Sequence, residues 1–246
     1  MAFIRSLSRL TLGAATLICL IAASTSRGET GWPKFQGPSA PSGLSTSLPL
    51  TWASADDMAW TIATPGYGQS SPVIYGDLLV LTSVEGPEKE TGIIVGLDTK
   101  TGKILWKKEI KTASGAKNNN YVSRAAPTPI IDAKQITVLF EGGNLLALDH
   151  QGRELWQRNL VEDFGEIKSR HGLSSSLEQN NDTVFVWIER ENEPYVLAVA
   201  KQDGTDRWKV PGLGVTSWSS PRLIPVDTSA HLVLSGVGNL AGFDPK

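Results

Sequence analysis

Histidine is the side chain best suited to metal binding and to proton transfer near neutral pH. The chain holds three, His150, His171 and His231. They stand far apart, without the short spacings of a histidine metal site. The sequence also lacks a Gly-x-Ser-x-Gly motif, so nucleophilic hydrolase chemistry has no support. We therefore predict no catalytic residue and no metal ligand.

Two further patterns suggest cofactors, and neither has the required context. Residues 236–241 show GxGxxA spacing, but a dinucleotide site needs a helix directly after the glycines. Residues 242–245 instead indicate the end of a strand and a turn. The adjacent Asp56 and Asp57 fall short of the roughly six to eight oxygens that Ca²⁺ takes, so we interpret them as a solvated turn.

Two loops remain as candidates for binding. The longest insertion, residues 114–124, precedes the second repeat described below, and a histidine and an arginine lie in the loop entering the third. Long loops at the face of a propeller often carry binding residues, although a plain solvated or structural loop is the favoured interpretation of both. The candidate binding edge for another protein comprises Asn119, Tyr121, Arg124, Arg170 and His171.

Composition excludes several classes of protein. With a net charge of −2 and a pI near 6.0, the chain is not a basic nucleic-acid binder. One cysteine, Cys19, allows neither a disulfide framework nor a Cys-rich metal site. Hydrophobic residues make up 40% of the chain, which is enough for a packed core.

The first 28 residues have the layout of a secretory signal peptide. Arg5 and Arg9 precede an uncharged apolar run from Leu10 to Ala23, and small residues follow. The run is short for a membrane span, which needs about 20 apolar residues. We therefore predict a signal peptide at 1–28, a secreted or periplasmic protein, and no membrane span in the mature chain. An uncleaved N-terminal anchor is the alternative.

The remaining chain repeats every 50 residues or so, the spacing typical of propeller blades. Three segments each place a glycine four positions before a tryptophan, and two of them carry an aspartate ahead of the glycine. Each repeat offers four short, β-rich apolar runs and no convincing amphipathic helix. The motif residues are Asp98, Gly102 and Trp106, then Asp149, Gly152 and Trp156, then Gly204 and Trp208.

This pattern predicts an all-β fold: a β-propeller with four-stranded antiparallel blades. A β-helix is the structural rival, but its repeats are much shorter. In each turn the aspartate can accept backbone N–H bonds and the glycine can adopt positive φ. The tryptophan would then pack against the neighbouring blade, burying about 150–250 Å².

The repeats also predict the domain organisation. Residues 29–64 would form a leader, in which Trp60 resembles an outermost strand that could close a ring. Residues 65–246 would hold three full units and a fourth that stops before its glycine and tryptophan. We therefore expect a fragment of about four blades.

The motif Asp-x-x-Thr-Gly-x-x-x-Trp, complete at residues 98–106, resembles the PQQ-like (quinoprotein alcohol dehydrogenase-type) repeat β-propellers. The second copy lacks the threonine and one spacer residue, and the third has Ala200 in place of the aspartate. The leader at 32–38 and the Ser-Ser-Pro opener at 70–72 are similar to those of secreted bacterial members. The resemblance implies a ring of about seven or eight blades.

Two functions follow from the resemblance. The first is a binding or scaffold module without chemistry of its own, whose partner is another protein at a propeller face. The second is a fragment of a PQQ-dependent dehydrogenase oxidising an alcohol or sugar, for which the family implies PQQ with calcium. No residue here demonstrates a cofactor site, and the disulfide common in that branch is absent from the mature sequence.

Overall fold

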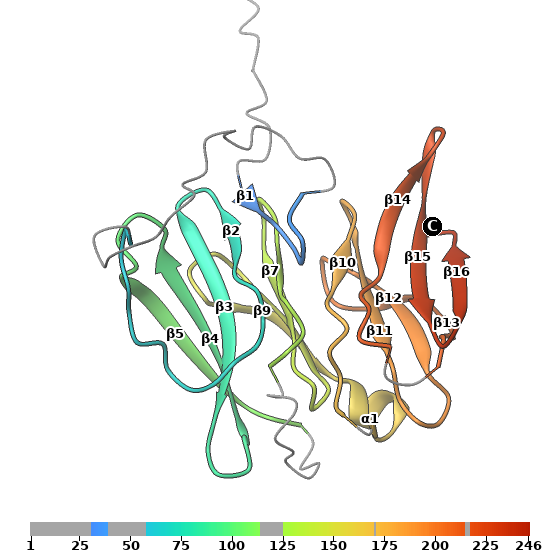
Figure 1. Ribbon diagram of the computed structural model, residues 1–246, viewed down its shortest axis with the longest axis horizontal. Coiled ribbons are helices and arrows are strands. Elements are labelled where there is room, and N and C mark those ends of the chain that lie inside the picture. The colour runs from blue at the N-terminus through green and yellow to red at the C-terminus, as the bar shows by residue number, and fades with distance from the viewer. Residues whose placement is uncertain (1–30, 39–57, 114–124, 170, 215–216) are drawn as a thin grey trace, which may run out of the picture.

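The computed structural model describes residues 31–38, 58–113, 125–169, 171–214 and 217–246. Within these ranges the protein is built almost entirely of antiparallel strands, as the sequence predicted. The strands form four sheets that follow one another in chain order, from the first on the left of Figure 1 to the fourth on the right. The described residues form an open arc of sheets, so the fold is a partial β-propeller.

Each sheet is an up-and-down meander whose spatial order equals its chain order. The first sheet comprises β1 (Gly31–Trp32), β2 (Val73–Tyr75), β3 (Leu78–Glu85), β4 (Thr91–Asp98) and β5 (Ile104–Lys111). The second comprises β6 (Ile130–Ile131), β7 (Ile136–Leu139), β8 (Asn144–Leu148) and β9 (Glu154–Asn159). The third comprises β10 (Glu178–Gln179), β11 (Thr183–Ile188), β12 (Tyr195–Ala200) and β13 (Asp206–Pro211). The fourth comprises β14 (Arg222–Val226), β15 (Ser229–Gly236) and β16 (Asn239–Phe243).

The core lies between the sheets. One apolar cluster joins the first sheet to the second, another joins the second to the third, and a third joins the third to the fourth. Strands in the middle of the second and third sheets, such as β11, are buried along their whole length because neighbouring sheets cover both faces. The outermost strand β5 alternates instead between more and less exposed residues, as expected when one face meets solvent.

The strand pairing leaves room for each repeat tryptophan. Trp106, Trp156 and Trp208 lie opposite Gly96, Ala147 and Ala198, respectively. In all three sheets the register shifts directly after this small residue. A Cβ added to Gly96 would overlap the indole of Trp106, so the first sheet requires glycine here, whereas the second and third sheets accommodate alanine.

One helix among the described residues departs from the all-strand expectation. The helix α1 (Leu160–Phe164) follows β9, and the side chain of Asn159 caps it by accepting bonds from Val161 N and Glu162 N. Leu160 is buried in the core between the second and third sheets. At five residues the helix is too short for a hydrophobic period, which explains why periodicity missed it. In the described ranges, no helix has the length and apolar character that crossing a membrane requires.

Candidate functional site

The complete repeat motif builds a closed turn between β4 and β5. Asp98 Oδ1 accepts bonds from Lys100 N, Thr101 N and the Thr101 hydroxyl, at 3.1, 2.8 and 2.7 Å. Gly102 reverses the chain at φ +71°, and its N–H donates to Asp98 O. The hydrogen bonds from Thr101 hold the pKa of Asp98 below its usual value. The aspartate therefore organises a turn.

The other two copies close with the same kind of bond, from the glycine N–H to the first carbonyl of the turn, although the second turn is one residue shorter. Gly152 N donates to Asp149 O, and Gly204 N donates to Ala200 O. Where the third repeat lacks the aspartate, Asp203 Oδ1 accepts from the backbone and hydroxyl of Thr205 instead. A carboxylate thus fixes the turn in all three copies.

Two of the three repeat tryptophans dock on the turn of the next sheet. Trp106 Nε1 donates to His150 O at 2.9 Å, and a Cβ on Gly152 would lie 2.7 Å from the indole. Trp156 Nε1 donates to Lys201 O at 2.7 Å, and its ring lies against Gly204 in the same way. The tryptophans are therefore packing residues at the joints between sheets.

Trp60 extends this series, whereas the third repeat tryptophan, Trp208, departs from it. Trp60 lies against Gly102, and its Nε1 donates to Thr99 O at 2.9 Å, so it occupies on the first sheet the place that Trp106 occupies on the second. Trp208, at the joint toward the fourth sheet, has a buried Nε1 with no acceptor among the described residues. Its ring lies 5.8 Å from that of Phe185.

A second joint runs along the segments that open the repeats. The backbone N–H of Ser71 donates to Thr128 Oγ1, that of Thr128 to Ser176 Oγ, and that of Ser176 to Ser220 Oγ, each at 3.0 Å. Each hydroxyl belongs to the sheet that follows its donor. The Ser-Ser-Pro pattern is thus a hydrogen-bonded ladder between sheets.

We expect Ser176→Ala to lower the free energy of unfolding by about 1–3 kcal/mol, because it leaves the amide of Thr128 buried without an acceptor. Ser176→Thr is the matched control, since Thr128 already fills the equivalent rung. Urea unfolding of the three proteins measures the effect. If both variants lowered the free energy of unfolding equally, the loss would come from packing and not from the hydrogen bond.

We call the edge formed by the first meander strand of each sheet, β2, β6, β10 and β14, the inner rim. It is held by one buried carboxylate and by the described part of the leader, residues 31–38, which we call the leader from here on. Lys34 Nζ contacts both oxygens of Glu178, at 2.6 and 2.8 Å, and both side chains are buried. Glu178 also accepts from Gln179 N and from Leu223 N of the fourth sheet, at 2.8 and 3.1 Å. No local sequence pattern predicts this pair, whose members stand 144 residues apart.

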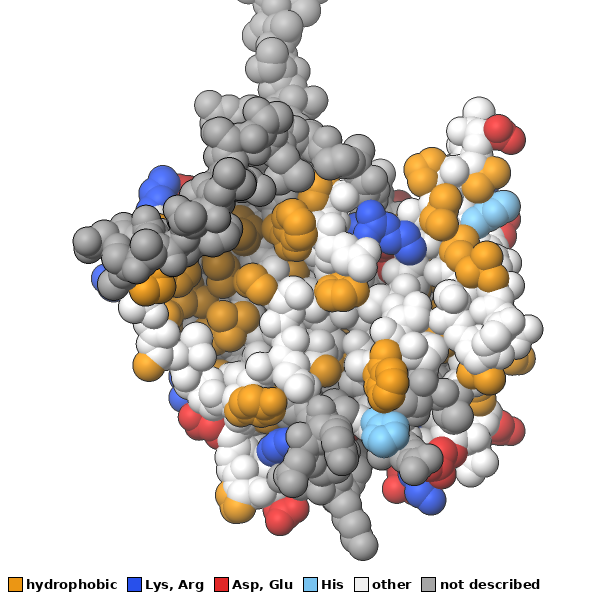
Figure 2. All heavy atoms as spheres, in the orientation of Figure 1, with side chains coloured by type: hydrophobic (Ala, Val, Ile, Leu, Met, Phe, Trp, Pro, Cys, Tyr) orange, Lys and Arg blue, Asp and Glu red, His pale blue; other side chains and the backbone are white. Residues whose placement is uncertain are grey.

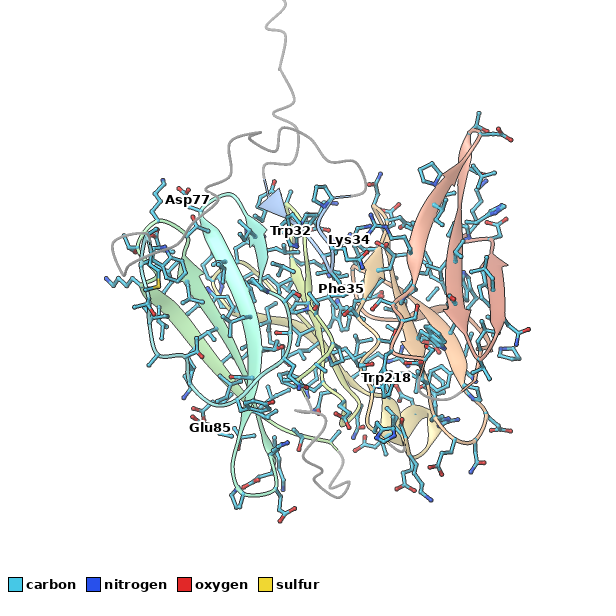
Figure 3. All side chains as sticks on the ribbon, in the orientation of Figure 1. Trp32, Lys34, Phe35, Asp77, Glu85 and Trp218 are labelled. Atoms are coloured by element: carbon cyan, nitrogen blue, oxygen red, sulfur yellow. The ribbon has the colours of Figure 1, made fainter. Side chains whose placement is uncertain are left out.

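A cavity of about 430 Å³ adjoins this rim. Its lining includes Lys34, Phe35, Glu178, Trp218 and Arg222. Phe35 and Trp218 are 37% and 67% exposed, and Trp218 adopts a positive φ of 52° that is rare for a non-glycine residue. Figure 3 shows Phe35 near the centre of the molecule and Trp218 below it, closer to α1, and Figure 2 shows apolar side chains spread over the face in view.

Of the five residues predicted to form a binding edge, one lies among the described residues. His171 lies in the loop before the third sheet, with its ring 5.7 Å from that of Trp218. Asn119, Tyr121, Arg124 and Arg170 lie outside the described residues. Residues 1–28, the predicted signal peptide, also lie outside them.

Glu189 is a buried carboxylate between the third and fourth sheets. It is 1% exposed, and its Oε1 accepts from the backbone N–H of Ser217 at 2.7 Å and from the Ser217 hydroxyl. Burial raises the pKa of Glu189 above its ordinary value of 4.5. The folded state therefore binds the proton more tightly than the unfolded chain does.

Glu189→Gln should raise the free energy of unfolding at neutral pH, because the amide retains an acceptor for Ser217 and removes a buried charge. Above its raised pKa the ionised carboxylate lowers the free energy of unfolding. This loss disappears as the pH falls to about 4.5, because the carboxyl group of the folded protein is then protonated. Thermal unfolding across this range measures the gap between variant and wild type, which should close on acidification. A gap independent of pH would contradict the assignment.

The four meandering sheets, joined by tryptophans that dock on repeated turns, define a repeat β-propeller. The family model of the outer membrane protein assembly factor BamB matches residues 50–202, more than half of the chain. The chain belongs to this family of PQQ-like repeat proteins. No curated protein sequence matches it.

Several solved structures are similar to the chain at low identity. BamB from Moraxella catarrhalis is 22% identical with a TM-score of 0.45, over 69% of this chain and 44% of that one. A europium-containing methanol dehydrogenase is 19% identical with a TM-score of 0.48, over 63% and 27%. A quinohemoprotein alcohol dehydrogenase from Comamonas testosteroni is 15% identical with a TM-score of 0.43, over 60% and 21%. The chain spans less than half the length of each.

The described residues do not supply an ion site of the kind the dehydrogenase hypothesis implies. Among them, no three His, Cys, Asp or Glu side chains come together as ligands for a metal ion. The buried carboxylate of the rim, Glu178, is already paired with Lys34. We therefore derive no step through PQQ or calcium.

Proposed function

We propose that the chain is an exported β-propeller module that binds a protein partner and performs no chemistry of its own. Membership of a family described as an outer membrane protein assembly factor supports a binding role. A rigid face with an exposed tryptophan, such as Trp218, is a common feature of protein interfaces. Export and a periplasmic or secreted location belong to the same proposal, since they depend on the predicted signal peptide.

One observation carries this proposal: the polar groups at the inner rim are bonded to the chain itself. Glu178 is held by Lys34 and by two backbone amides. The hydroxyls of Thr128, Ser176 and Ser220 accept bonds from the preceding sheet. Groups used in this way hold sheets together and position them, which is the task of a scaffold.

The organisation of the chain within a ring is also a proposal. We infer that the segment around Trp60, to which no strand is assigned here, serves in a ring as the outermost strand of the blade preceding the first sheet. Trp60 supports this assignment, because it docks on Gly102 as Trp106 docks on Gly152. The fourth sheet has three strands among the described residues.

The competing hypothesis, a PQQ-dependent dehydrogenase, is tested by activity. The purified chain is incubated with PQQ and Ca²⁺, and reduction of an artificial electron-acceptor dye is followed with alcohols and sugars. We expect no reduction above that of PQQ and Ca²⁺ alone. Saturable, substrate-dependent reduction would overturn the scaffold proposal.

A further inference from the structure

The leader, residues 31–38, is bound to the inner rim as a peptide ligand would be. Its strand β1 adds to the edge of the first sheet, with Trp32 opposite Ile74. Its next residue, Pro33, accepts a bond from Ile131 N of the second sheet at 2.9 Å. Figure 1 shows β1 in blue beside β2, with the described leader running on toward β10. One short segment thus contacts successive sheets through its backbone.

The four inner strands present equivalent positions to this segment. Counting from the repeat openers, Ile74, Ile131, Gln179 and Leu223 occupy the same place in the four sheets. The first two meet the leader backbone, and the amides of the other two donate to Glu178. The rim is therefore a row of equivalent backbone positions. Those of the first two sheets pair with the backbone of the leader, and the amides of the last two donate to the carboxylate of Glu178.

Lys34 of the leader pairs with the carboxylate at the end of this row. Its ammonium contacts both carboxylate oxygens, and the exposed fractions of the two side chains are 8% for Lys34 and 1% for Glu178. A carboxylate buried to this extent is costly unless a cation neutralises it. Figure 3 places Lys34 between β7 and β10, with Phe35 beside it. The buried acid thus makes the rim selective for a segment that carries a positive charge at this point.

We propose that the inner rim is a peptide-binding site, specific for a strand-forming segment that delivers a lysine to Glu178, and that the leader fills it in cis. Strand addition supplies affinity through main-chain bonds, and a pocket for one side chain supplies specificity. Tethering gives the leader an effective concentration in the millimolar range, so it outcompetes a free peptide of equal contacts. The inference rests on the leader contacts and would survive a finding of enzymatic activity.

The first test uses the full chain carrying Lys34→Glu, which sets two carboxylates against each other and releases the leader. The probe is a fluorescent peptide with the sequence of residues 31–38, and binding is followed by anisotropy. We expect saturable binding to the variant and at least about tenfold weaker binding to wild type, whose leader occupies the site. A control peptide with glutamate in place of its lysine should not bind. Equal binding of both peptides, or of one peptide to both proteins, would overturn the proposal.

A second test needs no destabilising change in the leader. Amine acylation of the native protein, followed by mass spectrometry, compares Lys34 with the exposed Lys100. Lys34 should react at least about tenfold more slowly in wild type, and Glu178→Gln should remove most of that protection. Lys100 should react alike in both proteins. Rapid modification of Lys34 in wild type, or protection that survives Glu178→Gln, would contradict a carboxylate-gated site.

Discussion

Replacing Trp156 with alanine is expected to lower the free energy of unfolding by about 3–5 kcal/mol, the range found for large aromatic residues in cores. The indole is 8% exposed, docks against Gly204 and donates to Lys201 O across the joint between the second and third sheets. Its removal leaves a cavity at that joint and an unpaired carbonyl. Chemical denaturation followed by circular dichroism measures the loss.

Leu155→Ala is the matched control for this substitution. Leu155 is the preceding residue of β9 and is 50% exposed, so its truncation should cost about 0.5 kcal/mol or less. A loss at Trp156 no larger than at Leu155 would mean that the tryptophan does not hold the joint. The packing role assigned to the repeat motif would then be wrong.

Gly152→Ala should be the second large effect, because two costs add at one position. Gly152 has φ +77°, and the new Cβ would lie 2.7 Å from the ring of Trp106. A left-handed backbone costs a non-glycine residue about 1–2 kcal/mol. Displacing the indole adds overpacking of about 1–3 kcal/mol.

Gly76→Ala separates these two costs. Gly76 has φ +59°, but nothing lies within 4 Å of the Cβ it would gain. It should therefore show the backbone cost alone, and Gly152→Ala should exceed it by about 1–3 kcal/mol in the same unfolding experiment. If both variants lost the same free energy of unfolding, Gly152 would serve only the conformation of the turn and have no role in the docking of Trp106.

The sequence predicted the parts of the fold that depend on contacts between residues close together in the chain. The turn at Asp98 and Gly102 is closed by residues within a few positions, so its pattern is visible in one repeat and recurs in the next. The residues opposite the tryptophans also carried a usable signal. Gly96, Ala147 and Ala198 each precede the repeat aspartate, or the alanine replacing it, by two positions, and all are small.

Other features depend on pairings that no local pattern contains. Lys34 and Glu178 belong to segments that meet only because the leader crosses the assembled sheets. Glu178 stands where other repeats have Val73 or Ile130, and only the folded arrangement shows that the exception is a buried ion pair. The helix α1 left one local trace, an Asn159 cap with Glu162 three positions later, which periodicity alone overlooks.

The most direct test of the binding-module proposal is equilibrium dialysis of the purified chain against PQQ in the presence and absence of Ca²⁺. The inner rim is bonded to the chain's own leader, so we predict equal PQQ concentrations on both sides of the membrane under both conditions. Calcium-dependent retention of PQQ approaching one molecule per chain would contradict the proposal and favour the dehydrogenase.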